Sequence, residues 1–118
     1  MRIVETLADL ELREPDPNEA ISVRNGSTSN TWPAPLIFYY TSNSTATPLY
    51  PYIRTSGAGV GRYVSPNIND PVQDIRYWGA VSGMTNDATP IIQEVINSGA
   101  PVVYIPNGSY ALRSTLMV

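Results

Sequence analysis

The chain has 118 residues and a formal net charge of −3, and it contains neither cysteine nor histidine. It therefore has no disulfide, no thiol nucleophile, no His-containing catalytic triad and no zinc site of the usual kind. Acidic residues outnumber basic ones, so a nucleic-acid partner is not expected, and no segment approaches the ~18 apolar residues of a membrane span. Eleven prolines and eight glycines beside 42% apolar residues predict a folded protein made mainly of strands and turns.

The first 64 residues predict a small sheet domain with one short helix near its start. Thr6 suits the N-cap of a helix over residues 6–10, and Asp9 stands where a capping box needs its acidic partner. The two prolines within residues 13–18 prevent this helix from continuing. Alternating or aromatic-rich runs then predict four strands, over 20–24, 36–40, 50–54 and 62–64. Because Pro51 cannot donate a ladder hydrogen bond, the third of them is expected at a sheet edge.

A linker is predicted over residues 65–71, where two prolines and two asparagines occur in seven positions. Beyond it, residues 72–78 predict an extended segment. Thr89 suits a helix N-cap, Pro90 suits the first helical position, and Gly99 suits the left-handed residue that follows a helix. Four apolar residues at helical spacing form one face of this predicted helix: Ile91, Ile92, Val95 and Ile96.

Two short strands are predicted after the helix, over 102–105 and 109–112, with a turn at 106–108 between them. No turn or helix-stop signal follows the second strand before Val118. We therefore expect the 118 residues to be the front of a longer polypeptide.

Residues 74–112 resemble the opening segment of right-handed parallel β-helix proteins of the pectate-lyase superfamily. Residues 74–80 (Asp-Ile-Arg-Tyr-Trp-Gly-Ala) correspond to that family's Asp-hydrophobic-Arg-aromatic-aromatic-Gly-Ala motif, and residues 103–110 to its closing strand and Pro-x-Gly-x-Tyr turn. A gapless comparison also matches Asp87, Thr89, Pro90, Ile92 and Gln93. The loop between these motifs departs from the family. Ser-Gly-Met at 82–84 replaces Gly-Asp-Gly, and Asn-Asp-Ala at 86–88 replaces most of an acidic run.

This resemblance implies a mainly β fold with short helices. A small sheet domain over 1–64 is followed by the linker over 65–71, and residues 72–118 form the helical cap and first strands of a right-handed parallel β-helix. The first coil of a solenoid exposes an apolar end that a terminal element must cover, and a helix with Ile92 and Ile96 facing inward is suited to this. The residues expected to form the cap and its turns are Trp78, Gly79, Asp87, Thr89, Pro90, Ile92, Ile96, Gly99, Pro106, Gly108 and Tyr110.

Residues 1–64 resemble the short module that precedes this opening segment in many bacteriophage tailspikes. The module contains a Thr-x-x-Asp-Leu helix, an aromatic strand ending in Tyr-Tyr and a Gly-x-Gly-Arg-aromatic strand, and residues 6–10, 38–40 and 59–63 occupy these places. The two resemblances together identify the chain as similar to the N-terminal segment of a phage tailspike.

The tailspike resemblance implies a homotrimer in the virion, made in the host cytoplasm and released by lysis. Residues 1–64 are expected to contact a phage tail or baseplate protein, through the acidic first 19 residues or the aromatic strands. The missing C-terminal region is expected to bind a host polysaccharide and to depolymerise it as a lyase or glycoside hydrolase. The residues expected at a subunit or tail contact are Phe38, Tyr39, Tyr40, Tyr52 and Arg62.

No catalytic, metal-binding or cofactor-binding residue, and no cofactor, is expected within the chain itself. The glycines at 57, 59 and 61 are interpreted as a turn, because no Lys-Ser/Thr pair follows them as in a phosphate-binding loop. Asp87 is better suited to a helix N-terminus than to a glycosidase carboxylate pair. Two other functions remain open, a non-enzymatic tail fibre or adaptor that carries a separate receptor-binding protein, and the front of a secreted cellular polysaccharide-degrading enzyme.

Overall fold

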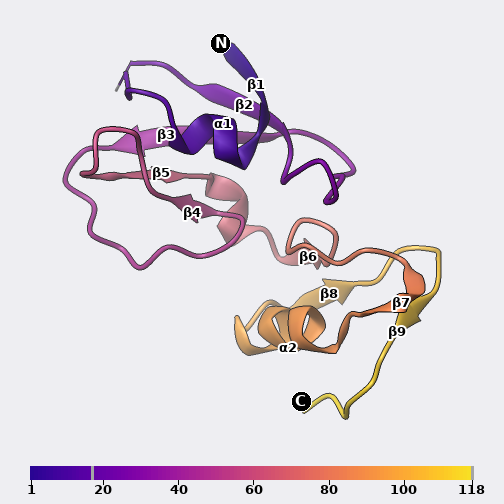
Figure 1. Cartoon of the computed structure of the whole chain (residues 1–118). Helices are drawn as coiled ribbons and strands as arrows, with labels where there is room; N and C mark the ends of the chain where they lie inside the picture. Colours follow the sequence, from indigo (N-terminus) through magenta and orange to yellow (C-terminus); the bar gives the residue numbers. More distant parts are fainter. Residues whose placement is uncertain (17, 118) are drawn as a thin grey trace. The chain divides into compact units, whose positions relative to one another are not determined.

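A computed structural model describes residues 1–16 and 18–117 of the chain. The chain divides into two compact units, Met1–Asn69 (unit 1) and Asp70–Val118 (unit 2), and the division falls inside the segment predicted as a linker. Both units consist mainly of short strands with few short helices, which is the predicted coarse fold class (Figure 1). Among the described residues, no helix has the length and hydrophobicity needed to cross a membrane.

Unit 1 contains a five-stranded sheet with the order β1-β2-β3-β5-β4 (Figure 1). β1 pairs with β2 in parallel, and the other pairs are antiparallel. A short helix follows β1, and a 3-10 helix, η1, follows β5. The bounds are β1 Arg2–Thr6, α1 Leu7–Glu11, β2 Ile21–Asn25, β3 Leu36–Thr41, β4 Ile53–Arg54, β5 Arg62–Val64 and η1 Pro66–Asn69.

The capping box predicted at the start of α1 is confirmed. The Thr6 hydroxyl accepts from the Asp9 backbone N–H at 3.4 Å, and the Asp9 carboxylate accepts from the Thr6 N–H at 3.2 Å. These bonds satisfy two backbone groups that a helix start otherwise leaves unpaired. The helix then buries Leu7 and Leu10, which are 2% and 0% exposed.

The register between β2 and β3 places the core side chains of these strands on one face of the sheet. Ile21 lies opposite Phe38, and Val23 lies opposite Leu36, so these four side chains point to the same side. All four are buried, at no more than 2% exposure. Side chains on β3 alternate between faces, so its next residue, Tyr39, points away from this core and is 51% exposed.

Three elements of unit 1 differ from the prediction. The sequence pattern does not predict β1, which forms by pairing with a strand 19 residues further along the chain. Only Ile53–Arg54 of the strand predicted over 50–54 is extended, because Leu49 and Ile53 exchange backbone hydrogen bonds of 2.9 and 2.8 Å across a turn with a cis Tyr50–Pro51 peptide bond. β4 does lie at the sheet edge, as Pro51 predicts. Residues 66–69 of the predicted linker form η1, which contacts β3.

A buried polar network ties the loop after β2 to the turn before β4. The side-chain oxygen of Asn30 accepts from the Tyr50 hydroxyl at 2.6 Å and from the Trp32 indole N–H at 3.2 Å. The Trp32 backbone N–H donates to the side-chain oxygen of Asn25 at 3.1 Å. Asn30 and Trp32 are both 5% exposed, and Gly26 lies directly against the network. A Cβ atom at Gly26 would collide with the Tyr50 hydroxyl and the Asn30 side chain.

We therefore expect Gly26→Ala to lower the free energy of unfolding of unit 1 by about 2 kcal/mol or more, because the network must shift and leave buried polar groups unpaired. Urea denaturation followed by circular dichroism measures the change. Thr28→Ala, at an exposed position of the same loop, is the matched control and should be close to neutral. Equal urea midpoints for the two variants would show that the network does not stabilise the unit.

Unit 2 contains two separate parallel ladders and one longer helix. β6 pairs with β8, and β7 pairs with β9, both in parallel, while the helix α2 connects β7 to β8. Val72 lies opposite Val102, and Asp74 lies opposite Tyr104. The bounds are β6 Val72–Asp74, β7 Gly83–Asp87, α2 Thr89–Asn97, β8 Val102–Tyr104 and β9 Tyr110–Ala111.

The segment predicted as extended over 72–78 is a strand only as far as Asp74. The Asp74 carboxylate accepts from the Arg76 backbone N–H at 2.9 Å and from the Arg76 guanidinium at 2.6 Å. Such a side-chain bond two residues on is typical of an Asx turn, and it turns the chain at the end of β6. Ile75 and Trp78 are buried in this turn, at 0% and 5% exposure. The sequence pattern does not predict β7, which pairs with β9 through an interrupted register.

Candidate functional site

The candidate site is the start of α2 together with the loop and segment that contact it. The predicted N-cap is wrong by one residue, because Ala88 occupies the cap and Thr89 is the first helical residue. Ala88 has no capping side chain, and Asp87 supplies the hydrogen bond instead: its Oδ1 accepts from the Thr89 backbone N–H at 3.0 Å. Pro90 is accordingly the second helical residue and not the first, as predicted for it, although it still lies in the first turn.

The pKa of Asp87 is lowered from its ordinary value of 3.8, chiefly by the backbone hydrogen bond from Thr89 and then by the Thr89 side chain. The Arg113 backbone N–H also donates to Asp87 Oδ1, at 3.3 Å. All these interactions favour the ionised carboxylate. A carboxyl group held in this form is a poor proton donor near neutral pH, so the environment of Asp87 suits helix capping rather than acid catalysis.

Because the folded-state pKa of Asp87 is lowered, its ionised form stabilises the fold above the ordinary value of 3.8, and this contribution is lost as the pH falls through the lowered pKa. We therefore expect Asp87→Asn to reduce the urea midpoint near neutral pH, with a difference from the wild type that disappears in acid. Urea midpoints measured across the acid range test this. Glu94→Gln, which removes an exposed carboxylate of the same helix, is the control. A difference that stays constant with pH would contradict the role of the charge.

The apolar face of α2 is only partly the predicted one. Ile92 and Val95 are buried, at 2% and 0% exposure, whereas Ile96, which we predict to face inward, is half-buried. Around the helix axis, Ile92 and Val95 are only about 60° apart, so both can face the core. Ile96 lies about 40° beyond Ile92, at the edge of this buried face. Gly99 follows the helix with a φ of +81°, the left-handed conformation predicted for it.

We expect Val95→Asp to cost about 3 kcal/mol or more in free energy of unfolding, since it buries an unpaired charge. Ile96→Asp should cost clearly less, because the half-buried side chain can turn its carboxylate toward water. Thermal and urea unfolding of the two variants provide the comparison. If Ile96→Asp proved the more damaging of the two, the orientation of α2 described here would be incorrect.

The other predicted cap and turn residues lie in the turn after β6, in the turn before β9 and on β9 itself. The buried Trp78 indole N–H donates to Oε1 of the buried Gln73 at 3.1 Å, and Gln73 Nε2 donates to the Asp70 carbonyl at 2.9 Å. Pro106 is buried and Gly108 is exposed in the turn before β9. Tyr110 is half-buried on β9, opposite Gly83.

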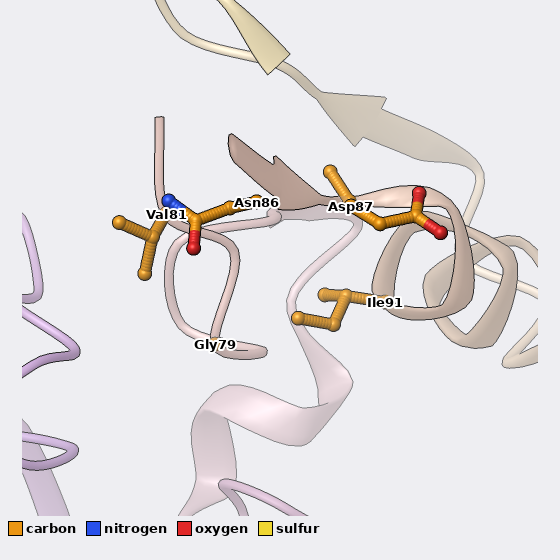
Figure 2. Close-up of a pocket in the computed structure, with 6 residues that line it drawn as sticks. Gly79, Val81, Asn86, Asp87 and Ile91 are labelled. Atoms are coloured by element: carbon orange, nitrogen blue, oxygen red, sulfur yellow. The ribbon is translucent and has the colours of Figure 1, made fainter. Parts of the chain in front are cut away.

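A shallow hollow of about 250 Å³ adjoins the start of α2 (Figure 2). It is lined by Gly79, Val81, Asn86, Asp87, Ala88 and Ile91. Figure 2 shows the Asp87 carboxylate directed toward the first turn of α2, away from Asn86 and Val81. No group of three or more acidic, His or Cys side chains suited to a metal ion occurs in the described part of the chain. The polar side chains that line the hollow are those of Asn86 and Asp87, and the Asp87 carboxylate already caps α2.

The predicted contact residues of unit 1 do not form one surface. Phe38 and Tyr52 are 0% and 2% exposed and lie in the core, so the prediction that they contact another subunit or the tail is wrong. Tyr40 is half-buried, its ring meets Tyr63 edge-on at 5.7 Å, and its hydroxyl donates to the Val60 carbonyl at 3.0 Å. The guanidinium of Arg62 holds a loop by donating to the Ala46 carbonyl at 2.8 Å.

Tyr39 is the predicted contact residue that remains well exposed, at 51%. Pairing across β3, β5 and β4 places Val64 and Ile53 beside it on the same face, and both are half-buried. We call these three residues the Tyr39 row. The row forms an apolar stripe on the side of the sheet opposite Phe38.

Three acidic residues of the first 19 positions, Glu5, Glu11 and Glu19, form ion pairs within unit 1. Glu19 lies 2.9 Å from Arg2, and Glu11 forms an ion pair of 2.5 Å with Arg54. The Arg54 guanidinium also lies 5.3 Å from the centre of the Tyr50 ring, and burial raises the pKa of the Tyr50 hydroxyl. These pairs reduce the charge available for a partner along this stretch.

Several polar groups with structural roles are absent from the predicted site list, among them Asn30 and Gln93. Asn30 is the central acceptor of the unit 1 network, and Gln93 binds the backbone of Met117. Gln93 could have been suspected from its spacing of four from Asn97 on a polar helix face. The role of Asn30 is harder to predict, because the Tyr50 hydroxyl that donates to it belongs to a distant turn.

The chain matches no protein-family model, and no curated protein matches its sequence. The motifs of the two resemblances and the geometry described above are therefore the basis for a functional assignment.

Proposed function

We propose that the chain is the virion-attachment and β-helix-capping segment of a homotrimeric phage tailspike. Unit 1 contacts a protein of the phage tail or baseplate, and unit 2 begins a right-handed parallel β-helix. The complete protein binds a host surface polysaccharide and depolymerises it through a region outside this chain.

The pairing in unit 2 is the observation that carries the proposal. The chain forms β6 and β7, passes through α2, and then forms β8 beside β6 and β9 beside β7, in the same order and direction. Successive coils of a parallel β-helix stack on one another in this way. Ile92 and Val95 of α2 are buried, which supports a capping role for the helix.

The side-chain roles in unit 2 support a scaffold rather than a reaction site. Asp74 holds Arg76 in the turn after β6, and Asp87 caps α2. Both carboxylates are thus already used within the unit, which supports placing polysaccharide cleavage in another part of the polypeptide. In unit 1 the Thr6 capping box forms and Arg62 and Tyr63 begin β5, and both features lie within the motifs on which the tailspike resemblance is based.

Particles produced from the genome that encodes the chain provide the direct test. Quantitative mass spectrometry and immunolabelling with serum against residues 1–118 should find the chain in the tail, in multiples of three. Absence from the particle, or presence as a single copy or a dimer, would refute the proposal. A virion trimer whose full-length form leaves host polysaccharide intact would favour the non-enzymatic fibre or adaptor instead.

The Tyr39 row is the part of unit 1 best suited to contact between subunits, because it is apolar and Tyr39 is half exposed. We expect Tyr39→Arg to weaken a trimer of the chain at least ~30-fold, as loss of a central aromatic contact costs about 2 kcal/mol. Light scattering over a range of concentrations measures this. Leu12→Arg, which changes an 82% exposed residue outside the row, should leave the mass unchanged. An unaltered trimer in Tyr39→Arg would place the contact elsewhere.

A further inference from the structure

The chain contains the same tripeptide, Asn-Gly-Ser, once in each unit, at residues 25–27 and 107–109. An asparagine that precedes glycine loses ammonia without an enzyme when the glycine nitrogen attacks the side-chain amide carbon, because glycine has no side chain to hinder the approach. The attack requires a glycine N–H that is not hydrogen-bonded and an asparagine side chain that is free to rotate. The two copies share this chemistry, so their surroundings decide which of them reacts.

Both reacting groups are held at Asn25. Its Oδ1 accepts from the Trp32 backbone N–H at 3.1 Å, which fixes the side-chain amide. The Gly26 N–H, which would have to attack, donates to the Asn30 carbonyl at 3.0 Å. Asn25 also lies in β2, where it pairs with Thr6 of β1, and Gly26 is buried. The reaction at Asn25 therefore requires this part of unit 1 to open first.

Neither reacting group is held at Asn107. Both Asn107 and Gly108 are exposed, in the turn between β8 and β9. The Asn107 side chain and the Gly108 N–H form no hydrogen bond with any described residue. Gly108 has a φ of +133°, a conformation that residues with side chains rarely adopt. The turn therefore requires glycine at the position where the attack also requires it.

We propose that Asn107 is a site of spontaneous deamidation and that the fold protects Asn25 from the same reaction. The Gly108 nitrogen gives its proton to solvent base and forms a bond to Cγ of Asn107. The bond from Cγ to Nδ2 breaks, and Nδ2 leaves as ammonia after taking a proton from solvent. Water then opens the cyclic imide at either of its carbonyl groups, which gives aspartate or isoaspartate at position 107. This proposal does not depend on the proposed tailspike function.

The modified position lies at the entry to β9. Either product adds a carboxylate, and in the isoaspartyl product the main chain also gains a methylene group immediately before Gly108. The next carbonyl, that of Ser109, accepts from the Gly83 N–H at 2.7 Å, and Tyr110 then pairs with Gly83. The lengthened backbone is therefore directly adjacent to the pairing of β9 with β7.

Mass spectrometry of the 118-residue chain tests the proposal. The protein is incubated at mildly alkaline pH, where circular dichroism shows that it stays folded, and is then digested so that replacement of NH₂ by OH is measured at each site. We expect Asn107 to convert at least about tenfold faster than Asn25, because Asn25 reacts only from locally opened molecules. In Asn107→Gln, conversion at position 107 should nearly cease, because the longer side chain would have to close a larger ring.

The same incubation in concentrated urea separates the effect of the fold from that of the local sequence. The two rates should converge there, because both tripeptides are then solvated and unbonded. Equal rates in the folded chain, or slower conversion at Asn107, would overturn the proposal. So would a rate difference that persists unchanged in urea, since neighbouring residues and not the fold would then protect Asn25.

Discussion

The register between β2 and β3 is the constraint on which unit 1 depends. A shift of one residue would move Phe38 to the outer face and bring Tyr39 into the core, because side chains alternate along a strand. The observed register buries Ile21 and Val23 against Leu36 and Phe38, and β5 and β4 then continue the sheet beyond β3. The same alternation places the Tyr39 row on the opposite face of the sheet, where Tyr39 is 51% exposed.

In unit 2, side chains provide many of the hydrogen bonds that backbone ladders provide in a larger sheet. Its two ladders are short, and each has only two strands. Gln73 satisfies the buried Trp78 indole, Asp74 closes a turn, and Thr89 and Gln93 hold a segment that has no strand partner. The Trp78–Gln73 bond adds specificity to this small unit, since its loss would leave buried polar groups unpaired.

Features determined by neighbouring residues could be predicted from the sequence, and features determined by distant ones could not. The Thr6–Asp9 capping box and the left-handed Gly99 are local. β1 and β7 exist only because distant strands pair with them, and their own sequences carry weak patterns. Asp87 replaces Thr89 as the capping acceptor because the backbone at Ala88 already adopts a helical conformation. The face of each aromatic residue on β3 likewise follows from register, which aromatic content alone does not reveal.

The two tryptophans of the chain are divided between the units, and both are 5% exposed. Trp32 donates its indole N–H to Asn30, and Trp78 donates its indole N–H to Gln73, so each ring has a distinct polar neighbour within its own unit. Each unit thus carries one tryptophan, whose emission can be excited selectively over that of the tyrosines. Replacing either ring by phenylalanine leaves the emission of the other, which separates the unfolding of the sheet in unit 1 from that of the helix-capped ladders in unit 2.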